Sequence, residues 1–377
     1  MDMQTGTFTS FDGQSLFYRS WHPKVANGKL LLLLHRGHEH SERLDEIARH
    51  KAFEGYCIYS FDNRGHGQSS AEASYEFMHL VRDLDSFVTF VCDLEKKQTQ
   101  DLFIIANSVS GVVASTWVHD YAPAIKGMAL VAPAFKIKLY FPFAKPLLKL
   151  ALSFKPKLNI TSYVKSRFLT HNIAEQEKYD QDSLITPNIP ASQLTSLLDT
   201  GERIVKDAGM ITVPTLVLSA SKDYVVDSKV QGDFYANLSS PYKRFISLEG
   251  FYHGVLYENN ADLAIHEIAQ FAQEAFAIKP EDISDKLINL AEQECDKISF
   301  GSLPLYLRAN FACQRLAMRH LGFMSKGMKI GLKYGFDSGV TLDHIYKNQP
   351  EGVTKAGKLI DKGYLNSIGW KGIRQRK

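Results

Sequence analysis

The sequence is poor in cysteine and has no long apolar run. Its four cysteines, Cys57, Cys92, Cys295 and Cys313, have neither metal-like nor redox-like spacing, and four in 377 residues do not make a disulfide framework. We therefore expect reduced thiols. No stretch approaches the ~18 continuous apolar residues that cross a bilayer, and the opening MDMQTGTFTSFDG lacks the basic start and apolar core of a signal peptide. These absences predict a cytoplasmic protein.

A large net charge is also absent, with 44 Lys+Arg against 41 Asp+Glu. The balance is uneven along the chain, because residues 278–377 hold 17 basic and 10 acidic side chains, whereas residues 1–277 hold 27 and 31. With 45% hydrophobic and 23% charged residues, the composition is typical of a folded globular protein. The basic end GWKGIRQRK is interpreted as a solvated tail or linker, so we expect no nucleic-acid partner.

Residues 1–277 alternate short apolar runs with helical patterns, which is typical of an α/β fold with a mostly parallel sheet flanked by helices. The expected strands are 30–34, 56–61, 102–106, 127–132, 215–219 and 244–248. Between the second and third, apolar residues from Phe77 to Val91 recur at steps of three and four and predict a helix. After Ala277 the pattern is mainly helical. We therefore expect one domain over 1–277 and a basic helical segment over 278–377.

The alternation stops at about 135–209, where an insertion too long for a structureless loop separates two strands. We expect a helical cap there. Its first part, KIKLYFPFAKPLLKLALSFKPK (136–157), has six lysines and no acidic residue among its Tyr, Phe and Leu side chains. Such a surface suits peripheral contact with a membrane or a lipid aggregate. The alternative, which the sequence leaves open, is a cap helix whose leucines pack on the body while its lysines are solvated.

The strongest local signal is IIANSVSGVVAS (104–115), an apolar strand, a turn of small residues around Ser108, and a helix-compatible run. A serine on such a sharp strand-to-helix turn exposes its hydroxyl at the edge of the sheet, as a nucleophile requires. The usual pattern, Gly-x-Ser-x-Gly, is altered, because Ala106 and Ser110 occupy the glycine positions and Gly111 follows. A serine that merely caps a helix is the alternative interpretation.

Two further candidates follow predicted strands, in the chain order Ser, Asp, His. Asp223 lies in SASKDYVVD and His253 lies in EGFYHGVLYE. Loops at the carboxyl ends of parallel strands meet on one side of the sheet, so we expect His253 to act as the base for Ser108 and Asp223 to orient the imidazole. Asp227 is a rival acid, although an N-cap position explains it more simply.

The loop after the first predicted strand, in LLLLHRGHEHSERLD, is where an oxyanion amide is expected, to act with the amide of Val109. Losing one such donor typically costs ~10² to 10³ in turnover. His35, His38 and His40 in this loop lack the helical metal-ligand arrangement, so we expect no metal.

Together these motifs resemble the monoacylglycerol lipase and lysophospholipase branch of the α/β-hydrolases, which also contains the serine aminopeptidase-like hydrolases. The resemblance covers about residues 1–277 and rests on HRGHEHSER, FDNRGHGQSS, ANSVSG, SASKDYVVD and EGFYHGVLYE, in that order. It implies that the nucleophile is Ser108, the acid Asp223 and the base His253. It also implies that the oxyanion amides come from Gly37 and Val109.

The sequence departs from this family pattern at three places. The usual His-Gly-x-Gly loop has Arg36 and His38 at its glycine positions, and the other departures are Ala106 and Ser110. A side chain at a position that needs a glycine conformation would shift the loop, so these departures bear on catalytic efficiency more than on the fold. In the second motif, His66 is expected to be a packed loop residue.

The last hundred residues resemble a different segment. The run from Lys333 to Lys377 looks like the part of bacterial hydrolase–methyltransferase fusion proteins that leads into a class I S-adenosylmethionine-dependent methyltransferase. Such a site needs a Gly-rich turn after a strand, and the glycines do not fit G-x-G-x-x-G; they are Gly327, Gly331, Gly335 and Gly339. We expect no cofactor and no methyltransferase activity, and we interpret the chain as a shortened form of a longer protein.

The sequence therefore predicts a serine esterase or lipase that removes a single acyl chain from a monoacylglycerol or lysophospholipid-like ester through an acyl-enzyme. A thioesterase or aminopeptidase on the same fold is one alternative, although the lysine-rich cap disfavours an aminopeptidase, which must bind an ammonium group. A weakened hydrolase domain that acts as a scaffold for a methyltransferase is the other. Neither the acyl length, the head group nor the oligomeric state is determined by the sequence.

Overall fold

The computed structural model describes residues 1–69, 75–141, 143–279, 282–283 and 286. The chain divides into two units, Met1–His119 with Pro123–Ala277, and Asp120–Ala122 with Ile278–Lys377. The architecture below is that of the first unit. The helical pattern expected after Ala277 falls almost entirely outside the described residues, so it stays a prediction.

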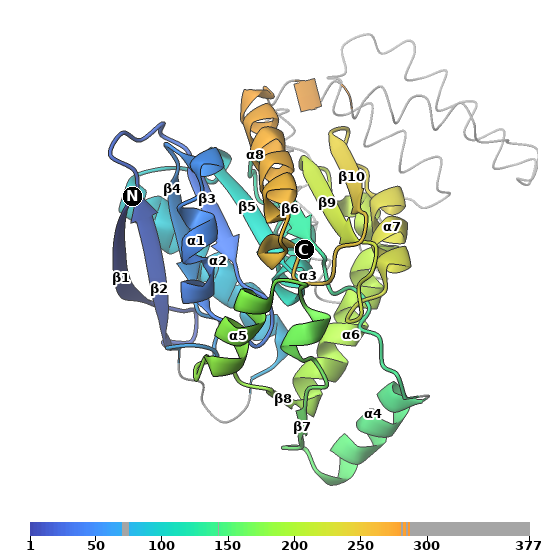
Figure 1. The fold of residues 1–377 in the computed structure, drawn as a ribbon. Coiled ribbons are helices and arrows are strands. Elements are labelled where there is room, and N and C mark those ends of the chain that lie inside the picture. The colour runs from blue at the N-terminus through green and yellow to red at the C-terminus, as the bar shows by residue number, and fades with distance from the viewer. Residues whose placement is uncertain (70–74, 142, 280–281, 284–285, 287–377) are drawn as a thin grey trace, which may run out of the picture. The chain divides into compact units, whose positions relative to one another are not determined.

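The first unit contains an eight-stranded sheet in the order β1-β2-β4-β3-β5-β6-β9-β10 (Figure 1). Its strands are β1 (Asp2–Thr9), β2 (Ser15–His22), β3 (Leu30–Leu34), β4 (Cys57–Phe61), β5 (Leu102–Asn107), β6 (Gly127–Val131), β9 (Thr215–Ala220) and β10 (Lys243–Leu248). All pairs from β4 to β10 are parallel, whereas β1 and β2 pair antiparallel with their neighbours. The predicted fold class and its six expected strands are confirmed.

The central parallel strands are rich in apolar residues because both faces of the sheet are covered there. All five leucines of β3 are buried, and every residue of β5, β6 and β9 is buried as well. The first strand pair was not predicted. In β1 a single residue, Phe8, is buried, so its sequence carries little of the apolar pattern that marks the central strands.

Helices connect the strands of the sheet along the chain and cover its faces. They are α1 (Asp45–Ala48), α2 (Phe77–Glu95), α3 (Val109–Tyr121), α7 (Ser228–Asn237) and α8 (Ala261–Ala277). The short 3₁₀ turns are η1 (Ser41–Leu44), η2 (Lys51–Phe53), η3 (Thr99–Asp101), η4 (Ser166–Phe168), η5 (Ala208–Met210) and η6 (Val255–Tyr257). The predicted helix from Phe77 lies in α2, whose apolar residues are buried at the expected spacing. Among the described helices, none combines the length and the apolar character needed to cross a membrane.

The segment between β6 and β9 carries the expected helices, together with a small strand pair that the sequence did not indicate. Its elements are α4 (Ala144–Phe154), β7 (Asn159–Thr161), α5 (Ile173–Gln181), β8 (Asn188–Pro190) and α6 (Ala191–Lys206). Strands β7 and β8 pair antiparallel over three residues each, which is too short for a periodic signal. We call residues 135–209 the cap, and its exact boundaries stay a prediction.

Candidate active site

Ser108 lies on a sharp turn between β5 and α3. Its φ is 51°, in the left-handed region that a non-glycine residue seldom adopts. Backbone bonds hold it there: its N–H donates to the Val131 carbonyl at 2.8 Å, and its carbonyl accepts from Gly111 and Ala134, each at 3.0 Å. The turn is therefore of the strained strand-to-helix type that raises a nucleophile above a sheet.

The altered glycine pattern around Ser108 has a structural explanation. The Ser110 hydroxyl donates to the His35 carbonyl at 2.6 Å, which ties the start of α3 to the loop after β3. The close approach falls one residue later, because a Cβ on Gly111 would lie 2.8 Å from the Cβ of Pro133. The residue that must be small is thus Gly111, and Ser110 has room for its side chain.

Ser108, His253 and Asp223 form one line of hydrogen bonds. The His253 Nε2 lies 2.8 Å from the Ser108 Oγ, and its Nδ1 lies 2.8 Å from the Asp223 Oδ2. The second carboxylate oxygen of Asp223, Oδ1, accepts from the amides of Val225 at 2.7 Å and Val226 at 2.9 Å. All three side chains belong to buried residues that follow β5, β9 and β10. Sheet topology thus brings together residues 145 positions apart in the chain.

The environment of Asp223 favours its charged form. Burial alone would raise the pKa of this carboxyl, but the charge and hydrogen bond of His253 and the two backbone amides outweigh it and hold the pKa below its usual range. The rival acid, Asp227, accepts instead from the Lys229 amide at 3.2 Å and caps the start of α7. Its other oxygen forms an ion pair with Lys136 at 3.1 Å.

The loop after β3 lies beside the start of α3. A Cβ on Gly37 would be 3.1 Å from the Val109 side chain, and both residues line the same cavity as Ser108. Arg36 does not adopt a left-handed φ, whereas His38 does, at 70°. The His38 Nδ1 donates to the Thr186 carbonyl of the cap at 2.7 Å. Of the two positions where the family usually has glycine, position 36 therefore has a backbone conformation open to any residue, whereas His38 has the left-handed conformation that favours glycine.

The histidines of this loop and of the second motif have protein partners. His35 uses Nδ1 toward the Arg36 carbonyl at 2.6 Å and Nε2 toward the Asn63 amide at 3.0 Å. His40 lies 2.9 Å from Asp182 of the cap. His66 donates to the Arg64 carbonyl at 3.1 Å, and burial together with neighbouring His35 lowers the pKa of His66 to about 3. We therefore interpret these imidazoles as neutral or paired side chains that shape the loops.

A cavity of about 450 Å³ opens above Ser108 and His253 between the body and the cap. Its cap lining is mainly apolar and includes Leu139, Leu148, Ile160, Ile189, Leu194 and Leu197. Within the described part of the chain, no Asp or Glu lines this cavity. The size and lining are those of a site for a small ligand with an apolar portion.

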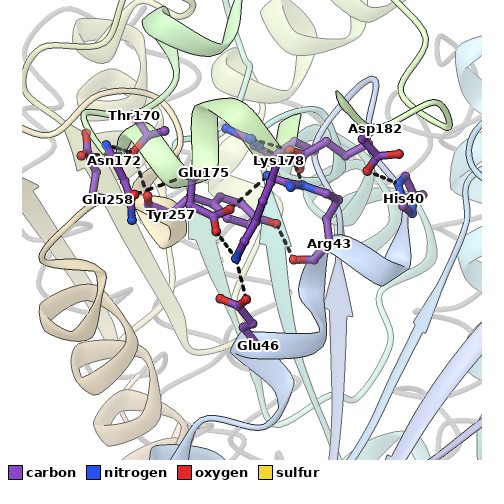
Figure 2. Close-up of polar contacts among 12 residues, drawn as sticks. His40, Arg43, Glu46, Thr170, Asn172, Glu175, Lys178, Asp182, Tyr257 and Glu258 are labelled. Carbon is purple, nitrogen blue, oxygen red and sulfur yellow. Dashed lines mark hydrogen bonds and ion pairs between the residues drawn. The ribbon is translucent and has the colours of Figure 1, made fainter. Parts of the chain in front are cut away.

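One side of the cap is held to the body by a polar network (Figure 2). On α5, Glu175 lies 3.1 Å from Arg43, and Lys178 lies 2.7 Å from Glu46. Figure 2 shows these side chains beside Tyr257 and Glu258, which follow His253 in the chain. The sequence analysis did not indicate this network.

The fold and the arrangement of this site define an α/β-hydrolase. Residues 26–260 match the family model described as serine aminopeptidase, S33, and this match covers more than half of the chain. The chain therefore belongs to the S33 family. Residues 268–377 match a second family, described as a putative methyltransferase, so the fusion architecture implied by the sequence is confirmed.

Several relatives and solved structures share this fold. The Escherichia coli protein YnbC is 42% identical over 98% of this chain, and the chain spans 64% of that protein's length. Human monoglyceride lipase is 28% identical over 71% of this chain and 89% of the lipase. The crystal structure of a soluble variant of Saccharomyces cerevisiae monoglyceride lipase covers 74% of this chain and 97% of its own, with a TM-score of 0.66 at 18% identity. The family and its relatives support a hydrolase of the esterase and lipase type.

Proposed function

We propose that this protein is a serine hydrolase that cleaves a single acyl chain from a monoacylglycerol or lysophospholipid-like ester. The observation that carries the proposal is the hydrogen-bonded line of Ser108, His253 and Asp223 beneath a mainly apolar cavity. An apolar cavity that ends at an activated serine suits an ester whose alkyl chain is long and whose head group is small.

In this proposal His253 Nε2 accepts the proton of the Ser108 hydroxyl as Oγ attacks the ester carbonyl. The amides of Gly37 and Val109 stabilise the resulting oxyanion. The tetrahedral intermediate then expels the alcohol, which takes its proton from His253, and the acyl group stays on Ser108. A water molecule, deprotonated by His253, attacks the acyl-enzyme and releases the fatty acid. Asp223 keeps the Nδ1 proton in place and stabilises the imidazolium throughout.

We further propose that the cap contacts a lipid surface through α4. None of the residues of this helix is buried, and its exposed apolar side chains, with that of the N-cap Phe143, recur at steps of three and four; Phe143, Leu147, Leu150 and Phe154 are 78%, 49%, 57% and 83% exposed. Lys145 and Lys149 instead pair with Asp199 of α6 at 2.8 Å. The sequence left open whether the leucines of this segment pack inward, and their exposure here supports the interfacial alternative.

The alternatives differ in what the cavity must bind. An aminopeptidase needs a carboxylate to hold the substrate ammonium, and the described cavity lining offers none. A thioesterase would use the same machinery and is separated by substrate preference alone. The cytoplasmic location, the lack of a cofactor and the lack of methyltransferase activity stay predictions, since 287–377 lies outside the described residues.

Covalent labelling tests the proposal. A fluorophosphonate probe should label the wild-type protein, and labelling should vanish in Ser108→Ala but persist in Ser86→Ala, a matched change on α2 at a hydroxyl that donates to the Arg82 carbonyl of its own helix. A panel of p-nitrophenyl esters of increasing length, acyl thioesters and aminoacyl anilides then ranks the substrate classes. An unlabelled wild-type protein would exclude the serine hydrolase, and a preference for anilides would exclude the esterase.

A further inference from the structure

Arg36 is a buried cation at a position where the family usually has glycine. Its residue is 5% exposed, and the guanidinium is paired with Glu39, which is fully buried. The Arg36 Nε donates to one Glu39 oxygen at 2.9 Å, and Nη2 donates to the other. Burying two charges costs desolvation energy, so such a pair is weak evidence for stability. The contacts around it indicate another role.

The guanidinium lies against the segment that carries the candidate base. Its Cζ is 4.7 Å from the centre of the Tyr257 ring, and a Cβ added to Gly254 would be 2.6 Å from Nη1. Gly254 directly follows His253, and its amide donates to the Leu169 carbonyl at 2.6 Å. Arg36 therefore fills the space behind the His253 loop, and that loop keeps a glycine where the guanidinium needs room.

The backbone of Arg36 sets the direction of the Gly37 amide. The Arg36 carbonyl accepts from the His35 Nδ1 at 2.6 Å and from the Glu39 amide at 3.4 Å. The His35 Nε2 accepts from the Asn63 amide, so the ring carries its single proton on Nδ1 and is neutral, and burial lowers the pKa of His35 in the same direction. The Arg36 carbonyl and the Gly37 N–H belong to one planar peptide unit, so bonds that fix the first also fix the second.

Glu39 extends the same contacts to the cap. One Glu39 oxygen lies 3.7 Å from the Arg43 Nε, and Arg43 reaches Glu175 of α5 at 3.1 Å (Figure 2). Burial opposes ionisation of Glu39, but the charges and hydrogen bonds of Arg36 and Arg43 prevail and lower its pKa. The Arg36–Glu39 pair is thus charged. It connects the loop after β3, which carries Gly37, with the loop of His253 and Gly254 and, through Arg43, with the cap.

We propose that Arg36 is a positioning residue for ester hydrolysis. Its side chain, clamped by Glu39 and held against Tyr257 and Gly254, anchors the loop after β3 against the His253 loop. The Gly37 amide, whose direction the bonds to the Arg36 carbonyl set, is thereby held in place relative to Ser108 and His253. The glycine normally found here allows a close approach, whereas this chain uses a side chain to link the two loops. This inference rests on the proposed function, because it assigns the Gly37 amide to the oxyanion.

Arg36→Met is the central test, and Arg49→Met is its matched control. Arg49 is an exposed arginine of the same region, paired with Asp45 at 2.9 Å. Steady-state kinetics on a short p-nitrophenyl ester should show kcat reduced ~10²-fold to 10³-fold in Arg36→Met, as for loss of one oxyanion donor, with KM little changed. Arg49→Met should match the wild type. Arg36→Lys keeps the positive charge but loses the paired N–H donors of the guanidinium, so its kcat should lie between those of Arg36→Met and the wild type.

A second measurement separates positioning from general destabilisation. A trifluoromethyl ketone forms a tetrahedral adduct with the serine, so its affinity should fall by the same factor as kcat/KM. The corresponding alcohol forms no adduct, and its affinity should stay within ~2-fold. Should Arg36→Met fail to fold, the double variant Arg36→Met/Glu39→Leu removes both buried charges together and should show the same losses.

The outcomes are distinct. An active wild-type enzyme whose Arg36→Met or Arg36→Gly variant retains kcat and ketone affinity would overturn the positioning role and leave the proposed function intact. Equal losses of ketone and alcohol affinity would also overturn it, because they indicate a collapsed cavity. A wild-type protein that neither hydrolyses esters nor binds the ketone would overturn both proposals.

Discussion

Replacing Asp223 by asparagine should nearly abolish turnover while leaving the site in place. The Asp223 Oδ1 accepts from two backbone amides, at 2.7 and 2.9 Å, and the Oδ2 faces the His253 Nδ1 at 2.8 Å. The single oxygen of asparagine must take the Oδ1 position, since an NH₂ group there would face two N–H donors. Its NH₂ group then points at Nδ1, so the imidazole proton moves to Nε2.

In that tautomer His253 cannot accept the Ser108 proton. We expect kcat to fall by about 10⁴-fold, which corresponds to ~5.5 kcal/mol of lost transition-state stabilisation. The assay is hydrolysis of a short p-nitrophenyl ester, with fluorophosphonate labelling rates measured in parallel. Asp227→Asn is the matched control, because that carboxylate caps α7, and its activity should stay within ~2-fold. An Asp223→Asn enzyme within ~10-fold of the wild type would show that this carboxylate does not set the His253 tautomer, and an equal loss of activity in Asp227→Asn would show that the effect is not specific to Asp223.

Three further predictions concern stability and surface binding. The pKa of His66 is lowered to about 3 in the folded state, so below pH ~6.5 the unfolded state binds a proton that the folded state does not. As the pH is lowered from ~6.5 to ~3, the free energy of unfolding should therefore decrease, by at most ~1.4 kcal/mol per pH unit. Denaturant titrations should show that His66→Gln makes this pH dependence weaker. Leu147→Glu on α4 should weaken sedimentation with anionic phospholipid vesicles without changing hydrolysis of a soluble ester, whereas Leu263→Glu on α8, where the leucine is 60% exposed against 49% for Leu147, should change neither; equal losses would contradict the α4 assignment. Gly111→Ala should cost ~1 to 3 kcal/mol of thermal-unfolding stability, because its Cβ would meet another side chain at 2.8 Å, whereas Gly232→Ala, with open space, should be neutral or stabilising.

Much of the fold could be predicted because the central strands are short, continuous apolar runs. Each of the six expected strands lies where the pattern indicated, and five of them, β3, β4, β5, β6 and β9, are buried throughout, which in a parallel strand covered on both faces requires apolar residues. The first strand pair escaped prediction because β1 lies at the edge of the sheet with a single buried residue. Strands such as β1 and the three-residue β7 satisfy their hydrogen bonds without a strong apolar pattern, so the sequence carries little trace of them.

The orientation of α4 shows a different limit. From the order of its lysines and leucines, either the apolar or the lysine face could pack against the body, and the sequence alone left both orientations open. In the structure Lys145 and Lys149 pair with the acidic residue Asp199 of α6, Leu147 and Leu150 are exposed, and Leu148 lines the cavity. A pattern within one helix cannot report the charge of the surface that it meets.

By itself, the sequence determined the chemistry that this protein is equipped for. Ser108, Asp223 and His253 each follow a strand, and because parallel strands end on one side of a sheet, their order and spacing already predicted a common site. The tertiary structure alone decided that Gly111, and not position 110, must lack a side chain, and that Arg36 turns behind the His253 loop. Both outcomes depend on contacts between segments that are separate in the chain, Gly111 with Pro133 and Arg36 with Gly254, and such contacts exist only once the sheet has brought the segments together.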